Sequence, residues 1–93
     1  MHKPELAAAI SEIAGLDSDD AQEILSIILD EITLALSRGR TVTLIGFGSF
    51  VCKHHAARQG HHPVSGDPIT IAAANTVHFR AGKKLKEKVN KIQ

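Results

Sequence analysis

The chain has 93 residues, of which 43% are hydrophobic and 23% charged, and its formal net charge is +1. That length predicts one small domain spanning residues 1–93. The single cysteine, Cys52, excludes an internal disulfide and fits a reducing compartment. No apolar run approaches the ~18 residues of a membrane span. No signal-peptide pattern opens the chain, so we expect a cytoplasmic protein without a membrane partner.

Charge is divided unevenly between the two halves of the chain. Residues 1–50 contain three Lys or Arg and eight acidic residues, whereas residues 51–93 contain eight Lys or Arg and two acidic residues. A net charge near zero says little about partners, but the distribution of charge along the chain is informative. The asymmetry indicates one surface for a polyanion and another for solvent.

Residues 1–39 are predicted to be helical and to form the dimerisation half of the chain. Lys3-Pro4-Glu5 is typical of a helix start, because proline suits the first turn and an acid suits the helix dipole there. Gly15 is expected to end this helix. Apolar residues at helical spacing predict a narrow buried stripe made of Leu6, Ala9, Ile10 and Ile13.

A second helix is predicted to begin at Ser18, its expected N-cap, and to end at Arg38-Gly39. Apolar residues surround most of this helix, among them Ile28, Ile32 and Leu36. A helix that is apolar on most sides must be covered from more than one direction. The first helix supplies one cover and a second subunit is the expected source of the other, so the sequence predicts an obligate dimer.

Residues 40–79 are predicted to form a sheet, and residues 80–93 a C-terminal helix. Thr41–Leu44 alternates as a strand does, with Val42 and Leu44 on one face. Gly46-Phe47-Gly48 permits a tight turn with the phenylalanine ring inserted into the core. In the C-terminal helix Leu85, Val89 and Ile92 are expected to face inward, while lysines occupy the other sides.

A two-stranded arm, residues 52–73, is predicted to project from this sheet. Its middle, from Lys53 to Asp67, has almost no large apolar side chains and therefore cannot be core. Clustered turn formers predict a tip around Pro63. Cationic side chains that lead to one small apolar wedge indicate a ribbon that follows a DNA groove and separates a base step.

Four motifs, in their joint spacing, resemble the bacterial histone-like HU and integration host factor family, and most of all HU. They are Gly46-Phe47-Gly48-Ser49-Phe50, the segment from Arg58 to Gly66, the run from Ile69 to Asn75, and the segment from Phe79 to Lys86. The resemblance covers essentially the whole chain. It implies an α+β fold built as an intertwined homodimer, with an N-terminal helix pair, an antiparallel β-sheet saddle with protruding β-ribbon arms, and a short C-terminal helix. It also implies that the arms enter the minor groove of DNA and that an intercalating proline bends the duplex.

The resemblance also implies roles for single residues. Pro63 matches the intercalating proline. The matching arm positions for DNA contacts are Lys53, His55, Arg58 and His61, and those on the body are Lys3, Arg80, Lys83 and Lys86. The aromatic core at the dimer interface is matched by Phe47, Phe50 and Phe79, which join Leu44, Ile28, Ile32 and Leu36 as expected core or interface residues.

Three histidines depart from the family pattern. Typical members carry Arg where this chain has His55 and His61, and histidine is mostly neutral above pH 7, so each arm should attract DNA less strongly. His62 stands before the tip proline, where the family commonly has Asn. The sequence leaves open how this residue affects the tip turn.

Several alternatives remain open. Double-stranded DNA is the expected partner, bound with little sequence specificity, but a sequence-preferring protein of the integration-host-factor type is the nearest alternative. Structured RNA, a paralogous subunit in a heterodimer, and a dimeric interaction module that binds no nucleic acid are the others. Single-strand binding is poorly supported, because the chain has no Trp or Tyr on which bases could stack.

No metal, cofactor or small-molecule substrate is predicted. Six residues of extended strand would separate His55 and His61 by roughly 20 Å, too far apart to share a metal. Cys52 lies in an apolar strand, and the acidic residues show no paired arrangement for acid–base chemistry. We therefore do not expect an enzyme.

Overall fold

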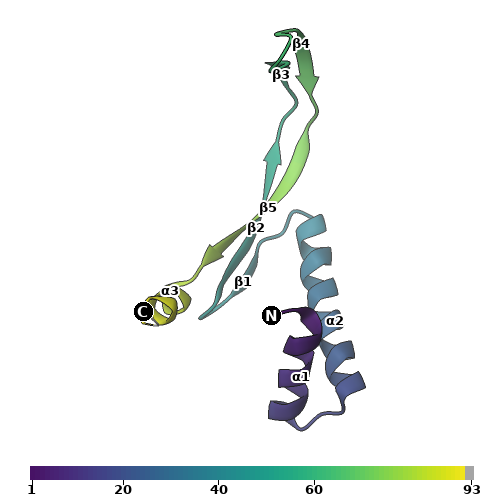
Figure 1. Ribbon diagram of the computed structural model, residues 1–93, viewed down its shortest axis with the longest axis vertical. Helices are drawn as coiled ribbons and strands as arrows, with labels where there is room; N and C mark the ends of the chain where they lie inside the picture. Colours follow the sequence, from purple (N-terminus) through teal and green to yellow (C-terminus); the bar gives the residue numbers. More distant parts are fainter. Residues whose placement is uncertain (92–93) are drawn as a thin grey trace. The chain divides into compact units, whose positions relative to one another are not determined.

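The computed structural model describes residues 1–91. Its elements, in chain order, are α1 (Lys3–Ala14), α2 (Ser18–Ser37), β1 (Val42–Leu44), β2 (Gly48–His55), β3 (Arg58–His61), β4 (Pro68–Ile71), β5 (Ala74–Ala81) and α3 (Lys83–Asn90). Helices come first, antiparallel strands follow and a helix ends the order, so the predicted α+β class is confirmed (Figure 1). The chain forms two compact units, which divide after Ala35. The predicted inward position of Ile92 lies outside the described residues.

Helix α1 begins and ends where the sequence predicts. Pro4 is the second residue of its first turn, after the N-cap His2 and the first helical residue Lys3. At the other end Gly15 is the C-cap, and the Leu16 N–H donates to the carbonyl of Ser11 at 3.0 Å. The Ser11 hydroxyl in turn donates to the Leu16 carbonyl at 2.6 Å. These bonds satisfy helix-end groups that would otherwise lack partners.

Helix α2 is capped one residue earlier than predicted. The Asp17 carboxylate accepts the Asp19 N–H at 3.3 Å, and the Asp17 carbonyl accepts the Ala21 N–H at 2.9 Å. Ser18 is already helical, so the predicted cap at Ser18 is wrong. Aspartate and serine cap helices about equally well, and only the backbone geometry separates two adjacent candidates.

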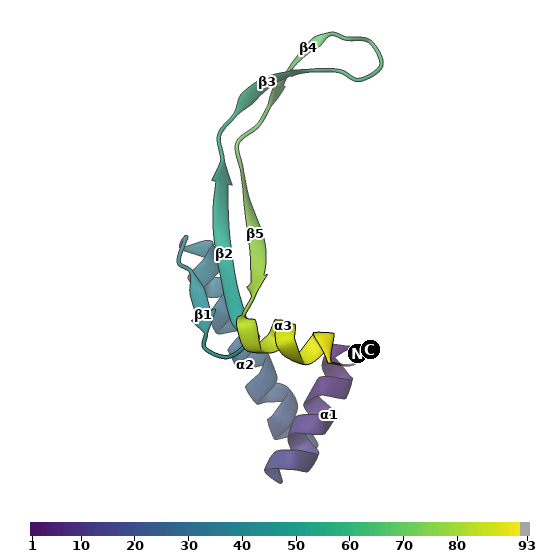
Figure 2. The same ribbon diagram turned by 90° about the vertical axis from the view of Figure 1, so that its left-hand side faces the viewer.

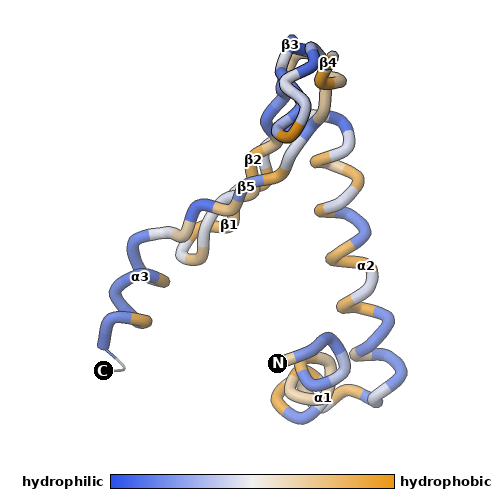
Figure 3. The backbone as a smooth tube through the Cα atoms, turned by 45° about the horizontal axis from the view of Figure 1, so that its top comes forward, coloured by the Kyte–Doolittle hydropathy of each residue, from blue (hydrophilic) through white to orange (hydrophobic). Residues whose placement is uncertain are grey.

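The helical unit buries little of its apolar surface. Its buried side chains are Ala7, Ala21 and Leu25. The stripe predicted for α1 is wrong at both ends, because Leu6 is exposed and Ile13 is 86% exposed. Two of the three buried side chains are alanines, which allow the two helices to approach closely. Along α2 the exposed large apolar side chains include Ile24, Ile27, Ile28, Leu29 and Leu34, and Figure 3 shows apolar positions recurring along this helix.

The strands form two antiparallel sheets that follow each other along one ribbon. The first has the order β1-β2-β5, and the second pairs β3 with β4. Figure 2 shows β2 and β5 side by side, continuing into β3 and β4 and closing in a loop. Pairing is interrupted at residues 56–57 and 72–73, within the predicted arm 52–73. Strand β5 runs to Ala81, so the sheet ends two residues beyond the predicted boundary at 79.

An aromatic cluster lies at the base of the ribbon. The Phe79 ring centroid is 5.4 Å from that of Phe47 and 4.9 Å from that of Phe50. A Cβ on Gly48 would lie 2.5 Å from the Arg80 carbonyl oxygen and 2.6 Å from the Phe79 ring, so only glycine fits there. The Phe47 ring is 45% exposed, so its predicted insertion into a core is wrong within one chain.

Candidate nucleic-acid interface

The two faces of the β2–β5 pair differ in chemistry. Residues directly opposite each other in an antiparallel pair place their side chains on the same face. One face carries the pairs Ser49–Arg80, Val51–His78, Lys53–Thr76 and His55–Ala74. The other carries the pairs Gly48–Ala81, Phe50–Phe79, Cys52–Val77 and His54–Asn75. We call the first the polar face and the second the aromatic face. The sequence-predicted residues Lys53, His55 and Arg80 therefore share one side.

Two histidines on the polar face share one hydroxyl. His55 Nε2 and His78 Nε2 each lie 3.0 Å from Thr76 Oγ1. A threonine hydroxyl has one proton to donate and two lone pairs that accept, so the Nε2–H of at least one ring must donate for both bonds to form. If both imidazoles are protonated, both donate to the oxygen. Thr76 therefore holds both rings in place whether they are neutral or charged.

Strand β3 places its two predicted DNA contacts, Arg58 and His61, on opposite faces. In the β3–β4 pair Arg58 faces Ile71, whereas His61 faces Pro68 three residues further along. Alternation along a strand puts residues separated by three positions on different sides. Arg58 therefore shares a face with Ile69 and Ile71, and His61 does not. In β3 the residues Arg58, Gln59 and His61 are exposed, and Gly60 is half-buried.

The tip of the arm is a closed turn from His62 to Asp67. The His62 N–H donates to the Asp67 carbonyl at 2.8 Å, and the Gly66 N–H donates to the His62 carbonyl at 2.9 Å. Pro63 is exposed at the start of this turn, so the tip predicted around Pro63 is confirmed. Gly66 adopts φ 75°, a left-handed conformation that glycine accepts without strain.

Helix α3 presents lysines on an exposed surface. Lys83 lies 3.9 Å from Glu87 one turn later, and both side chains are more than half exposed. An exposed pair of this kind contributes little to stability. The pair places the Glu87 carboxylate beside Lys83, one of the two DNA contacts predicted on α3. The other is Lys86, for which no ion pair is found among residues 1–91. Figure 3 shows α3 as largely hydrophilic.

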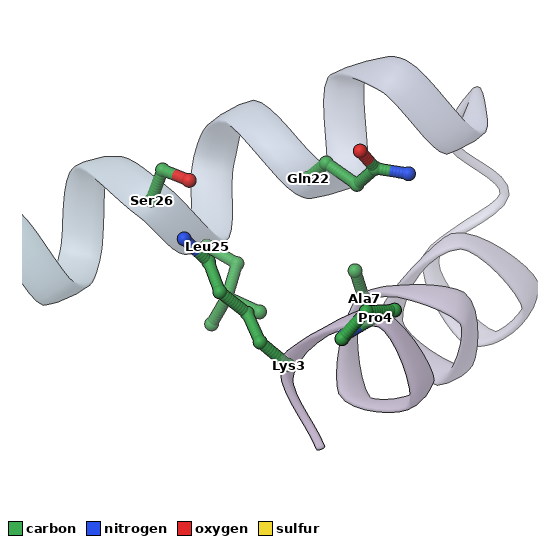
Figure 4. Close-up of a pocket in the computed structure, with 6 residues that line it drawn as sticks. All are labelled: Lys3, Pro4, Ala7, Gln22, Leu25 and Ser26. Atoms are coloured by element: carbon green, nitrogen blue, oxygen red, sulfur yellow. The ribbon is translucent and has the colours of Figure 1, made fainter.

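Lys3, a predicted contact, belongs to the helical unit. It lines a hollow of about 290 Å³ between α1 and α2, together with Pro4, Ala7, Gln22, Leu25 and Ser26. In Figure 4 its side chain extends from the start of α1 toward α2. The long apolar stem of a lysine can cover apolar surface while its ammonium group stays in water.

The comparisons with known proteins agree with this arrangement. The family model for bacterial DNA-binding proteins matches residues 1–90. The chain belongs to the bacterial DNA-binding protein family. It is 52% identical over 90 residues to DNA-binding protein HU-alpha of Pseudomonas aeruginosa, a match that covers 97% of this chain and 100% of that protein. It is 48% identical over 87 residues to DNA-binding protein HU-beta of Neisseria meningitidis, covering 94% of this chain and 98% of that protein.

Solved HU structures have the same fold. An Anabaena HU–DNA cocrystal structure matches with a TM-score of 0.83 at 39% identity, covering 96% of this chain and 97% of that one. HU from Thermotoga maritima matches with a TM-score of 0.67 at 35% identity, covering 96% of this chain and 98% of that one. The resemblance to HU is thereby confirmed. The family consists of DNA-binding proteins and not of enzymes.

The structure adds two residues that the sequence did not single out. Thr76 and His78 join the polar face only because of the register of β5 against β2. The alternation of polar and apolar residues from Thr76 to Phe79 was the available signal, but it does not say which strand they pair with. Within residues 1–91 no group of three or more His, Cys, Asp or Glu side chains could hold a metal ion. None of the helices in this range has the length and apolarity needed to cross a bilayer.

Proposed function

We propose that the chain is a histone-like architectural protein that binds double-stranded DNA in the minor groove and bends it. The observation that carries this proposal is the polar face of the ribbon, where Lys53, His78 and Arg80 share one side and no large aromatic side chain lies among them. Beyond it the arm ends in an exposed turn that contains Pro63. Cations that neutralise phosphates, followed by an apolar residue that separates a base step, are what minor-groove bending requires.

Little sequence specificity follows from the same residues. Lys53, His55, Arg58, His61 and Arg80 on the sheet, with Lys3, Lys83 and Lys86 on the helices, would contact phosphates, which carry no base sequence. Insertion of Pro63 selects steps that unstack easily and therefore reads deformability. A protein of this kind would be associated with the nucleoid in the cytoplasm and would need no cofactor.

The binding species in this proposal is a dimer, either of two copies or with a paralogous subunit. Ile28, Leu44 and Phe79 are more than 40% exposed within one chain, and Phe47 beside Phe79 is equally uncovered. Ile32 and Leu36 are half-buried. Burial of such side chains contributes roughly 1.5–3 kcal/mol each, so a second subunit that covers them would stabilise the fold considerably. We expect residues 1–93 to act as one cooperative domain once this surface is covered.

The test measures affinity and bending on the same duplexes. Energy transfer between end labels reports the bend, and titration at several salt concentrations reports the number of phosphates neutralised. We expect similar affinity for unrelated sequences, a steep salt dependence, and a bend on plain and on nicked duplexes. A preference of about a thousandfold for one sequence would identify the sequence-preferring alternative instead. Equal binding to duplex RNA without bending would identify shape recognition of RNA.

A further inference from the structure

Every backbone N–H in the tip turn has an acceptor inside the turn. Those of His62 and Gly66 bond to backbone carbonyls, at 2.8 and 2.9 Å. The Asp67 N–H donates to the Ser65 hydroxyl at 3.3 Å. The two that remain belong to Val64 and Ser65, and both donate to His62 Nδ1, at 3.2 and 3.3 Å. Pro63 has no N–H. One imidazole nitrogen therefore satisfies the two donors that directly follow the proline.

The same turn leaves two apolar side chains uncovered. Pro63 is exposed, and Val64 is 89% exposed. An isolated apolar pair at the end of a polar arm has no role in folding, since nothing covers it. The acceptor that fixes the backbone between these two residues therefore also fixes the direction in which they project.

We propose that His62 is a positioning residue for DNA bending, whose Nδ1 holds the tip in the shape that presents Pro63 and Val64 to a base step. This rests on the proposed function, because it assigns a role within the same bending event. The N–H groups of Val64 and Ser65 share the single lone pair of Nδ1 at 3.2 and 3.3 Å, so together they favour this turn over other tip conformations by roughly the factor of a single hydrogen bond, about two to ten. Without them Pro63 is still present but is directed toward the base step only part of the time.

The geometry specifies which substitutions keep this role. Nδ1 of histidine and Oδ1 of asparagine are the same number of bonds from the backbone, and asparagine commonly accepts backbone N–H groups two residues on. His62→Asn should therefore keep the turn. In His62→Gln the acceptor is one bond further out and no longer meets the N–H groups of Val64 and Ser65. In His62→Ala the acceptor is gone.

Protonation should have the same effect as removal of the acceptor. Nδ1 accepts only in the neutral ring that carries its proton on Nε2, and in the imidazolium both nitrogens are donors. The other titratable or charged groups nearby are Asp67 in the turn and His61 and Arg58 on β3, while β4 has none. A ring that gains this second proton can no longer accept the two N–H groups, so at saturating protein the bend should be smaller at about pH 5.5 than at about pH 8.

The experiment compares end-to-end energy transfer in one duplex saturated with wild type, His62→Asn, His62→Gln and His62→Ala, from pH 8 to about pH 5.5. We expect the Asn variant to bend like wild type at pH 8 and to keep its bend at low pH. The Gln and Ala variants should bend DNA less than wild type at pH 8 and should show no further loss at low pH, with unchanged circular dichroism. Gln59→Ala is the matched control, because it removes another arm hydrogen bond, from Gln59 to Thr70 at 3.3 Å, outside the tip. It should bend like wild type.

The outcomes separate this inference from the proposed function. Wild type that binds but does not bend DNA overturns both. Wild type that bends, with His62→Ala bending equally, overturns only the role of His62. Equal loss of the bend in the Asn, Gln and Ala variants overturns the role of the Nδ1 acceptor. A bend that is constant with pH in wild type, although His62→Ala is impaired, contradicts the protonation step.

Discussion

The helical unit and the ribbon are both largely exposed in a single chain, but their exposed surfaces have opposite character. On α2 the uncovered side chains include Ile27 and Ile28, and three side chains in the whole unit are buried, Ala7, Ala21 and Leu25. On the polar face of the ribbon the uncovered side chains include Lys53, His78 and Arg80, whereas the aromatic face leaves Val77 and Phe79 exposed. Exposure therefore predicts self-association through the helical unit and the aromatic face, and a water-compatible contact with a polyanion through the polar face.

The largest expected effect comes from putting a charge on the helical unit. Ile28→Asp should leave an unpaired carboxylate in the proposed subunit interface, which costs about 3–5 kcal/mol, a large part of the total stability of a small domain. Leu36→Asp should act in the same way. We expect no folded protein by circular dichroism, whereas the Ile28→Leu control should fold. The wild type should unfold in one transition whose midpoint rises with protein concentration. A folded, soluble wild-type monomer at micromolar concentration would refute the dimer.

The second effect is a change in DNA bending that should leave the stability of the protein unchanged. Pro63→Ala removes an exposed side chain, so the free energy of unfolding should change by no more than about 0.5 kcal/mol. The bend measured by energy transfer should fall sharply, and affinity should fall less, because the phosphate contacts remain. Measuring the thermal midpoint and the bend on the same preparation tests both halves. An unchanged bend would make Pro63 a turn former and nothing more.

A smaller effect distinguishes two lysines of the same helix. Lys86→Ala should flatten the slope of log affinity against log salt by about one. Lys83→Ala should flatten it less, because Glu87 lies beside Lys83. Glu87→Gln should conversely raise affinity. Lys88→Ala, on the same helix and outside the proposed contacts, serves as the control. If all three lysine variants give the wild-type slope, then α3 does not reach the DNA.

The smallest effect concerns the histidines of the ribbon. Protonation beside phosphates is favoured, so binding should take up protons and affinity should rise as the pH falls from about 8 to about 6. Binding measured against pH for wild type and for His55→Gln/His61→Gln tests this, and the double variant should respond less. His78→Gln is an informative addition, since His78 shares the Thr76 hydroxyl with His55. Identical pH responses in all proteins would exclude these histidines from the contact. The expected rise in affinity runs opposite to the loss of bend expected from His62, so the two effects can be told apart.

Local signals in the sequence were sufficient for much of the fold. Pro4 and Gly15 mark the ends of α1, and the turn formers around Pro63 mark the tip. Asp17 and Ser18 are adjacent and could each cap α2, so the sequence pattern could not decide which of them is the N-cap. The burial of Ala7 instead of Leu6 depends on how closely α1 and α2 approach, which helical periodicity does not specify.

The candidate site was predictable in composition but not in arrangement. Charge and spacing indicated Lys53, Arg58 and Pro63 directly. The partnership of His55 with Thr76 and His78 depends on strand register, which is set by pairing between residues more than twenty positions apart. The role of His62 depends on the distances within one turn, and the same histidine in an extended segment would have no acceptor role.

The interruption of pairing at residues 56–57 and 72–73 has a mechanical consequence. Both segments are pairs of alanines, so no large side chains pack across this unpaired joint between the two sheets. A two-stranded segment beyond such a joint is compliant, since an isolated hairpin is only marginally stable in water. DNA held by two compliant arms would sample a range of curvatures in place of one fixed angle. The protein would then lower the apparent persistence length of the DNA it binds without imposing a fixed bend angle.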